Sequence, residues 1–263
     1  MHSFGAYAGG TSGSTDAIAS SVGFGTSELE DMARFARVIA VEVAHHATQR
    51  GNARQFILNS DADREVYLSL LRENIEKYRA SLIGYCLMSN HVHLVMVPHQ
   101  ADALAKALKH THGRYAAYWN GKYHSSGHVW QGRFYSCPLD RPHLWEALRY
   151  TELNPVRAGM AAEAEAWIWS SAAVHCGTTA AEGWLAMEEW QGRWDVASWR
   201  NYLEAGETES ERMAVRQSTH TGRPLGSEEF VHELEEAAMR PLAPRKGGRH
   251  AKEAKDERQG ELF

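Results

Sequence analysis

Hydrophobic residues along the middle of the chain change their period several times, and each change predicts a new element. Short runs rich in β-branched residues predict strands, whereas apolar positions three and four residues apart predict helices with one buried face. The predicted order is β-α-β-β-α-β-α, over residues 37–47, 60–80, 82–88, 92–97, 102–119, 133–137 and from 140 onward. This order predicts an α+β fold, an antiparallel sheet with helices on one face, as in the split β-α-β folds.

The two ends of the chain differ in composition from this middle. Residues 1–31 are rich in Gly, Ser, Ala and Thr without an apolar period, which predicts a disordered segment and makes Met32 a candidate translation start. We expect a folded catalytic domain over 32–177 and a helical extension over 178–240, whose tryptophans favour helical packing over a platform for stacked bases. Residues 241–263 predict a flexible basic tail.

Charge and composition limit the class of protein. The net charge of -5 counts against nucleic-acid binding only as an average, because basic residues gather after the first predicted strand and after His91-Val92-His93. No apolar run approaches the length of a membrane span and the N-terminus lacks a signal peptide pattern, so we expect a cytoplasmic protein that is not bound to a membrane. The three cysteines, Cys86, Cys137 and Cys176, are scattered, which argues against a disulfide framework.

Two histidines separated by one residue are the first candidate for chemistry. His91 and His93 lie on a predicted strand, where alternate side chains share a face, so both point one way and Val92 points into the core. Imidazole is a common ligand of divalent ions. The sequence therefore predicts a metal site here, with ordinary hydrogen-bonded strand histidines as the alternative.

A second candidate lies about sixty residues downstream, on the helix that begins at Asp140. Tyr150 and Asn154 are four residues apart and therefore close on the helix surface. Asn154 precedes a proline, so it either caps the helix end or faces the same site as Tyr150. Two other tyrosines, Tyr115 and Tyr118, recur with the spacing of a buried stripe and are expected in the core.

The combination of these motifs resembles a known family. His-hydrophobe-His followed by Tyr-x-x-Leu-Asn-Pro-Val-x-Ala-Gly, with Gln49-Arg50-Gly51-Asn52 before it and Gly132-Arg133-Phe134 between, resembles the single-tyrosine HUH transposases, and within them the REP-associated tyrosine transposases. The resemblance covers roughly residues 38–177. It implies the HUH nuclease fold, with the histidines on a central strand and the tyrosine helix beside it.

The same resemblance implies a mechanism and a partner. Tyr150 would be the nucleophile that forms a 5′-phosphotyrosine link to single-stranded or hairpin DNA, while His91, His93 and Asn154 would hold Mg or Mn. The chain would act as a monomer or a homodimer. The residues expected to contact DNA are Arg50, Asn52, Arg114, Arg133, Arg149 and Arg157. Alternatively, several of these side chains only solubilise helices, and Asn52 only forms part of a tight turn.

Two other functions compete with this reading. A histidine-triad nucleotide hydrolase would need a further histidine where Val95 stands, so that alternative fails on its own motif. A domesticated regulator that binds DNA hairpins without cutting them stays open. The presence of both histidines, Tyr150 and Asn154 favours the enzyme, since a decayed enzyme is expected to have lost at least one of them.

Overall fold

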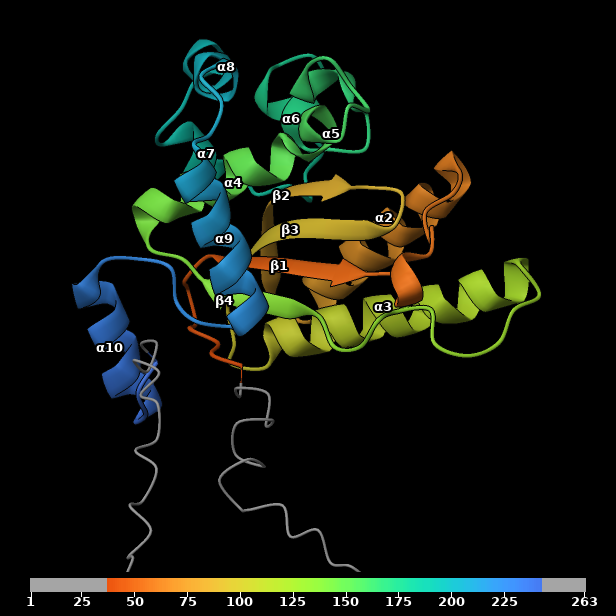
Figure 1. The fold of residues 1–263 in the computed structure, drawn as a ribbon, viewed down its shortest axis with the longest axis horizontal. Coiled ribbons are helices and arrows are strands. Elements are labelled where there is room, and N and C mark those ends of the chain that lie inside the picture. Colours follow the sequence, from red (N-terminus) through yellow and green to blue (C-terminus); the bar gives the residue numbers. More distant parts are fainter. Residues whose placement is uncertain (1–36, 243–263) are drawn as a thin grey trace, which may run out of the picture. The chain divides into compact units, whose positions relative to one another are not determined.

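An antiparallel sheet of four strands forms the centre of the computed structural model, which describes residues 37–242 (Figure 1). The spatial order of the strands is β2-β3-β1-β4. Their bounds are His45–Arg50 (β1), Ala80–Leu87 (β2), His91–Pro98 (β3) and Tyr135–Pro138 (β4). Three long helices alternate with them: α2 (Asp61–Lys77), α3 (Ala103–Lys122) and α4 (Arg141–Glu152). The α+β class and the order β-α-β-β-α-β-α are confirmed.

The first strand differs from the prediction at both ends. Residues 41 and 42 form a turn in which Glu42 has a φ of 60°, a left-handed conformation that interrupts extended structure, so β1 starts only at His45. At its other end, Gln49 and Arg50 pair with Val92 and with His91 across the sheet instead of forming a turn. The predicted strand at 37–47 was therefore placed too early in the chain, because residues 37–44 precede β1.

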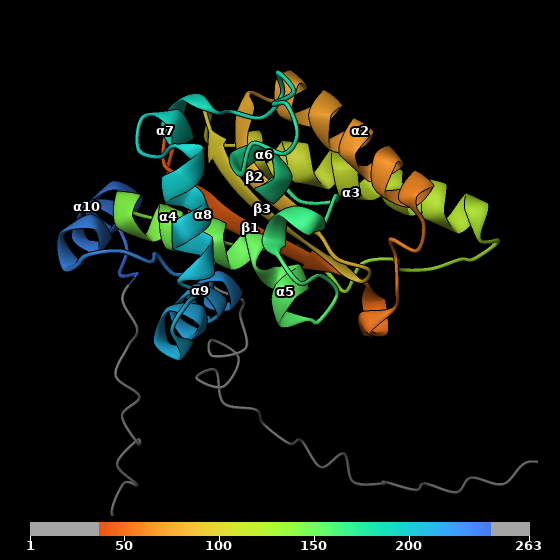
Figure 2. The same ribbon diagram turned by 90° about the horizontal axis from the view of Figure 1, so that it is seen from above.

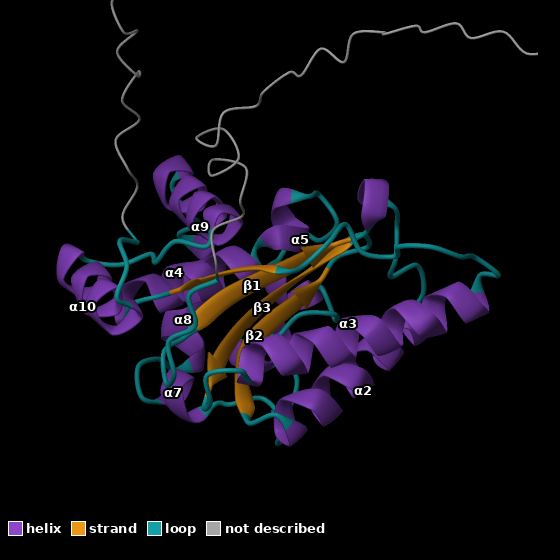
Figure 3. Ribbon diagram, turned by 90° about the horizontal axis from the view of Figure 1, so that it is seen from below, coloured by secondary structure: helices purple, strands orange, loops and turns teal. Residues whose placement is uncertain are grey.

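Helices cover both faces of this sheet (Figures 2 and 3). On one face, as expected, α2 and α3 pack against β3 through side chains such as Leu71, Leu104 and Leu94. On the other face, which the prediction of a single helical layer did not include, α4 packs Leu148 against Val95. Strand alternation explains this arrangement, because the successive residues Leu94 and Val95 point to opposite faces and are both buried.

The segment after α4 is helical, as the sequence predicts. It contains the short 3-10 helix η2 (Ala164–Ala166) and the helices α5 (Asn154–Arg157), α6 (Ala172–His175), α7 (Glu188–Gln191), α8 (Val196–Glu204), α9 (Glu209–Thr221) and α10 (Glu228–Ala238). The 3-10 helix η1 (Asn52–Arg54) follows β1. Within residues 37–242, no helix is long and apolar enough to cross a membrane. The expectations for residues 1–31, for Met32 and for the tail beyond residue 242 lie outside the described residues.

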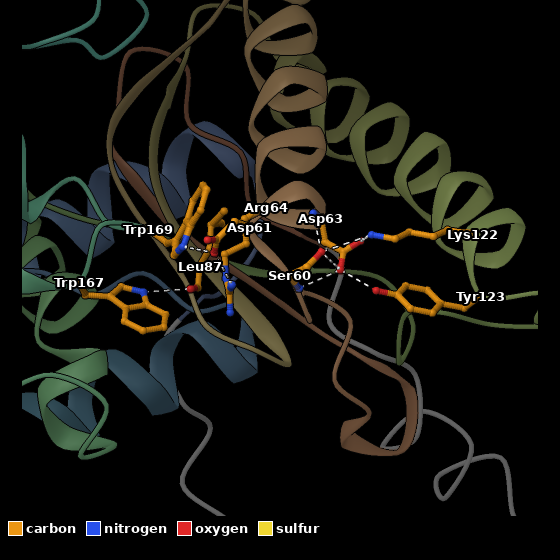
Figure 4. A network of polar contacts seen from close by, with 9 residues as sticks. All are labelled: Ser60, Asp61, Asp63, Arg64, Leu87, Lys122, Tyr123, Trp167 and Trp169. Carbon is orange, nitrogen blue, oxygen red and sulfur yellow. Dashed lines mark hydrogen bonds and ion pairs between the residues drawn. The ribbon is translucent and has the colours of Figure 1, made fainter.

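A buried carboxylate joins the start of α2 to the end of α3 (Figure 4). Asp63 is fully buried and forms a capping box with Ser60, whose side chain accepts from the Asp63 backbone N–H. Lys122 Nζ donates to Asp63 Oδ1 at 2.7 Å, and the Tyr123 hydroxyl donates to Oδ2 at 2.8 Å. Burial raises the pKa of Asp63, but these hydrogen bonds outweigh it and hold the pKa well below its ordinary value of 3.8.

We expect Asp63→Asn to lower the free energy of unfolding at pH 7 by about 2–4 kcal/mol, because it removes a buried charge from its donors. A folded-state pKa below 3.8 means that this contribution is complete above pH 3.8 and disappears as the pH falls below it. Urea unfolding at pH 7 and below pH 3.8 measures both effects. Glu65→Gln, an exposed change on the same helix, is the control, and equal stability of the two variants at pH 7 would contradict the prediction.

Candidate active site

The pairing of β1 with β3 places several polar side chains on the sheet face that α4 covers. Thr48 lies opposite His93 and Arg50 lies opposite His91 in the register. His46, two residues before Thr48, belongs to the same face of β1. Val92 is fully buried in the core on the opposite face. The prediction that His91 and His93 share a face and that Val92 turns away is confirmed.

Helix α4 brings Tyr150 to these histidines. The helix begins as the sequence predicts, with Asp140 as its N-cap and a proline in its first turn. The Tyr150 ring centroid is 5.5 Å from that of His93 and 5.7 Å from that of His46, in both cases edge-on. Tyr150 is 7% exposed and packs against Val215 of α9. Residues 57 positions apart in sequence therefore meet within one chain.

The hydrogen bonds of His91 and His93 leave one ring nitrogen of each for a ligand. His91 Nδ1 is 2.6 Å from Asn90 Oδ1, and because a carboxamide oxygen only accepts, Nδ1 carries the proton and Nε2 carries the lone pair. His93 Nδ1 is 3.0 Å from His46 Nε2. This pattern, in which one imidazole nitrogen is held by a neighbour, is the usual one for metal-binding histidines.

Burial keeps these imidazoles neutral. It lowers the pKa of His91 to about 3, and the positive charges of Arg50 and Arg157 act in the same direction. Burial likewise lowers the pKa of His93 well below its ordinary value, helped by His91 and His46. A neutral imidazole has the lone pair that a cation needs. The two rings are thus chemically suited to hold a divalent ion.

Asn154 combines the two roles that the sequence left open. Its Nδ2 donates to Tyr150 O at 3.0 Å and to Thr151 O at 3.2 Å, so the side chain closes the end of α4. It also lines the same pocket as Tyr150. Since both amide hydrogens are used, only Oδ1 could serve as a ligand. Among the described residues no three His, Cys, Asp or Glu side chains group to hold a metal, so a set of two histidines and an amide stays a prediction.

A pocket of about 590 Å³ opens around these groups and is strongly basic. Its walls contain no aspartate or glutamate. The lining residues are His46, Thr48, Gln49, Arg50, Arg54, His91, His93, Gln131, Tyr135, Tyr150, Asn154, Arg157, Arg212, Arg216, Thr219 and His220. The charge segregation expected from the sequence is therefore present in the fold, and the pocket is electrostatically suited to an anion.

Arg157 contacts Tyr150 directly. Its guanidinium carbon lies 4.4 Å from the centre of the Tyr150 ring, and its Nη2 donates to Tyr150 O at 2.7 Å. Burial raises the pKa of Tyr150, while the charges of Arg157, Arg216 and Arg50 oppose that rise. The phenol is consequently protonated at neutral pH in the protein alone, and its use as a nucleophile requires further activation.

The other residues expected to contact DNA lie away from this pocket. Arg149 is 5% exposed, pairs with Glu211 at 2.9 Å and lies over the Tyr202 ring, so it is part of the packing between α4 and the C-terminal helices. Arg114 pairs with Glu73 across α2 and α3. Asn52 and Arg133 are exposed and do not line the pocket. Only Arg50 and Arg157 of the predicted set line the pocket.

Sequence reasoning missed several pocket residues. On β1, the alternation of His46, Thr48 and Arg50 is a period of two polar residues on one face, and that signal was available. No comparable signal marks Arg216 or Thr219 on α9, which reach the pocket only because α9 packs beside β4 and β1.

A second buried carboxylate fixes the end of the tyrosine helix. Glu152 is fully buried, and its Oε1 accepts from Ser171 Oγ and from His175 Nδ1, each at 2.6 Å. Its Oε2 accepts from Trp199 Nε1 at 2.9 Å. The carboxylate thereby joins α4 to α6 and to α8, two residues after Tyr150.

The fold and the pocket define an α+β domain in which a strand histidine pair faces a helix tyrosine. Residues 40–153, which contain His91, His93 and Tyr150, match the model of a family described as Transposase IS200 like. This part of the chain is similar to the IS200-like transposases, and that similarity supports a transposase role.

Two solved structures are similar to the chain at low sequence identity. One is a REP-associated tyrosine transposase bound to a REP hairpin, with 15% identity, a TM-score of 0.45, and coverage of 53% of this chain and 82% of that one. The other is a Deinococcus radiodurans R1 protein with a provisional transposase assignment, with 16% identity, a TM-score of 0.32, and coverage of 48% and 91%. No curated protein matches the sequence.

We expect Glu152→Gln to lower the free energy of unfolding by about 2–4 kcal/mol. The glutamine NH₂ group would replace one accepting oxygen, so that a buried donor would lose its acceptor and face another donor. Denaturant unfolding of the variant measures the loss. Glu163→Gln, an exposed change that follows α5, provides the control. The prediction is wrong if both variants unfold at the same denaturant concentration as the unaltered protein.

Proposed function

We propose that this protein is a metal-dependent enzyme that nicks and rejoins single-stranded DNA with Tyr150 as its nucleophile. The observation that carries the proposal is the 5.5 Å separation of the Tyr150 and His93 rings, inside a pocket lined by five arginines. A tyrosine, two neutral imidazoles and concentrated positive charge are together suited to phosphoryl transfer. The similarity of residues 40–153 to a transposase family supports this reaction class.

In the proposed reaction, the guanidinium group of Arg50 binds the DNA backbone and orients the scissile phosphate. Arg157, which pairs with Glu207 at 2.7 Å, adds positive charge beside Tyr150. The Tyr150 Oη gives up its proton to solvent and forms a bond to phosphorus while the bond from phosphorus to the 3′ oxygen breaks. That oxygen keeps the electron pair and takes up a proton, leaving a 3′ hydroxyl and a 5′-phosphotyrosine link. The link conserves the phosphodiester energy, so a 3′ hydroxyl can later attack it and restore a DNA strand without ATP.

His91 and His93, with Asn154 Oδ1 as a third ligand, would hold Mg or Mn. When bound, the ion would supply positive charge that polarises the phosphate and favours the ionised phenol. The imidazoles contribute neutral lone pairs, and their partners Asn90 and His46 orient them.

The proposed DNA is a hairpin-forming repeat with an accessible single strand, an assignment that depends on the REP-associated sequence motifs. A base-paired duplex would have to be opened before its phosphate reached Tyr150 inside the pocket. Tyr150 meets His93 of its own chain, which supports action by a monomer. We propose a catalytic domain over 32–177 and a helical extension over 178–240. Helix α9 of the extension would complete the pocket of the catalytic domain, because its residues line that pocket.

Incubation of the protein with Mg or Mn and hairpin oligonucleotides from DNA beside its own gene should give a covalent protein–DNA adduct on a denaturing gel. Tyr150→Phe should abolish the adduct, because it removes the attacking oxygen and little else. Tyr115→Phe, a change to a buried core tyrosine, is the matched control and should retain the adduct. Hairpin binding without adduct or nicking by the unaltered protein would support the hairpin-binding regulator instead.

Arg50→Gln should weaken binding of single-stranded DNA about fivefold at 0.1 M salt and reduce the slope of log affinity against log salt by about 0.7, the effect of one lost phosphate contact. Fluorescence anisotropy over a range of salt concentrations measures both quantities. Arg114→Gln is matched in chemistry, but its guanidinium already pairs with Glu73 outside the pocket. Equal slopes for the two variants would remove Arg50 from the proposed DNA contacts.

A further inference from the structure

A chain of buried hydrogen bonds runs from helix α9 to His93, one of the proposed metal ligands. His46 and Thr219 are 1% and 2% exposed, and neither belongs to the motifs that identify the site. His46 Nδ1 is 2.7 Å from Thr219 Oγ1, and His46 Nε2 is 3.0 Å from His93 Nδ1. The planes of the two imidazole rings differ by 12°, which suits a hydrogen bond in the plane of both rings.

The direction of the chain is set at the Thr219 hydroxyl. This group has one hydrogen and two lone pairs. Its hydrogen is donated to Val215 O, one turn earlier in α9, at 2.7 Å. The two lone pairs then face His46 Nδ1 and, at 3.3 Å, Cys137 Sγ. With its only hydrogen committed to the backbone, Thr219 accepts from His46, so the proton of His46 resides on Nδ1.

We propose that Thr219, acting through His46, is a positioning residue that fixes the tautomer of His93. His46 carries its proton on Nδ1, so its Nε2 accepts from His93 Nδ1–H. His93 consequently has no proton on Nε2, the nitrogen left for the proposed ion. The reversed chain, with Thr219 donating to His46, would put a hydrogen on His93 Nε2 and block ligation.

This inference deepens the proposed function, on which its catalytic consequence depends. It gives the C-terminal extension a definite task, because α9 would fix the protonation pattern of a histidine more than 120 residues earlier in the chain. It also gives a reason for the buried histidine on β1, His46, beside the pair formed by His91 and His93 on β3. Packing alone would be satisfied by an apolar side chain at that position.

The tautomer can be read directly in the metal-free full-length protein by two-bond ¹H–¹⁵N correlation of its histidine rings at neutral pH. His93 is assigned by the loss of its signals in His93→Gln. We expect a protonated Nδ1 and an unprotonated Nε2 on His93. A protonated Nε2 on His93 would overturn the proposal. This spectrum requires no variant at Thr219, so a folding defect in such a variant cannot obscure the answer.

Three variants test whether Thr219 sets the tautomer. Thr219→Val is nearly isosteric but lacks the acceptor, so His93 should gain a proton on Nε2 in part or all of the molecules. Thr219→Ser keeps the hydroxyl and should retain the original spectrum. Thr221→Val is the matched control, because Thr221 makes the same hydrogen bond to the preceding turn at an exposed position. An unchanged His93 tautomer in folded Thr219→Val would refute the inference.

Mn²⁺ affinity gives a second readout, measured by calorimetric titration with the metal alone. Loss of such an indirect contact should weaken binding about tenfold in Thr219→Val, and the serine variant should recover most of it. Unchanged affinity in Thr219→Val would overturn the inference. If the unaltered protein binds no Mn²⁺, the proposed metal chemistry fails, while the NMR spectrum still decides the tautomer. An absent DNA adduct with normal Mn²⁺ affinity would likewise contradict only the proposed reaction.

Discussion

The register between β1 and β3 is the constraint on which the site depends. On β3 the side chains of Val92, Leu94 and Met96 fill the core beneath α2 and α3, and all are at most 1% exposed. A slip by one residue would exchange the two faces of the strand, moving three large apolar groups into the basic pocket and two histidines into the core. Each apolar side chain contributes roughly 1.5–3 kcal/mol by its burial, so the core holds the histidines in their orientation far more strongly than any polar contact of their own does.

The tyrosine is positioned by a different part of the chain. Helix α4 packs on the sheet through Leu148. At its end Glu152 accepts hydrogen bonds from Ser171 and His175, at the two ends of α6, and from Trp199 of α8. Helix α9 then closes the pocket and adds Arg216 and Thr219 to its walls. Helices α6, α8 and α9 all follow residue 153, where the match to the transposase family ends. The C-terminal segment is therefore a part of the pocket and not an appendage to a finished catalytic domain.

Sequence patterns predicted what depends on local periodicity and missed what depends on packing between distant elements. The seven elements, the shared face of His91 and His93, and the proximity of Tyr150 and Asn154 all follow from strand and helix periods. Arg149 shows the limit: it adjoins Tyr150 in sequence, but neighbouring residues on a helix point about 100° apart, so it packs against Tyr202 instead of entering the pocket. His46 and Thr219 are 173 residues apart, and no local pattern links them.

One set of charges serves both halves of the proposed chemistry. Arg50 and Arg157 disfavour a second positive charge nearby, and together with burial they lower the pKa of His91, which keeps its lone pair free. The same two arginines, with Arg216, favour a negative charge on Tyr150 and oppose the rise in its pKa that burial causes. Neutral imidazole and ionised phenol are the forms that metal binding and nucleophilic attack require. A basic pocket in a protein of net charge -5 is thus suited to bind phosphate and also to bias both titrating groups toward their reactive forms.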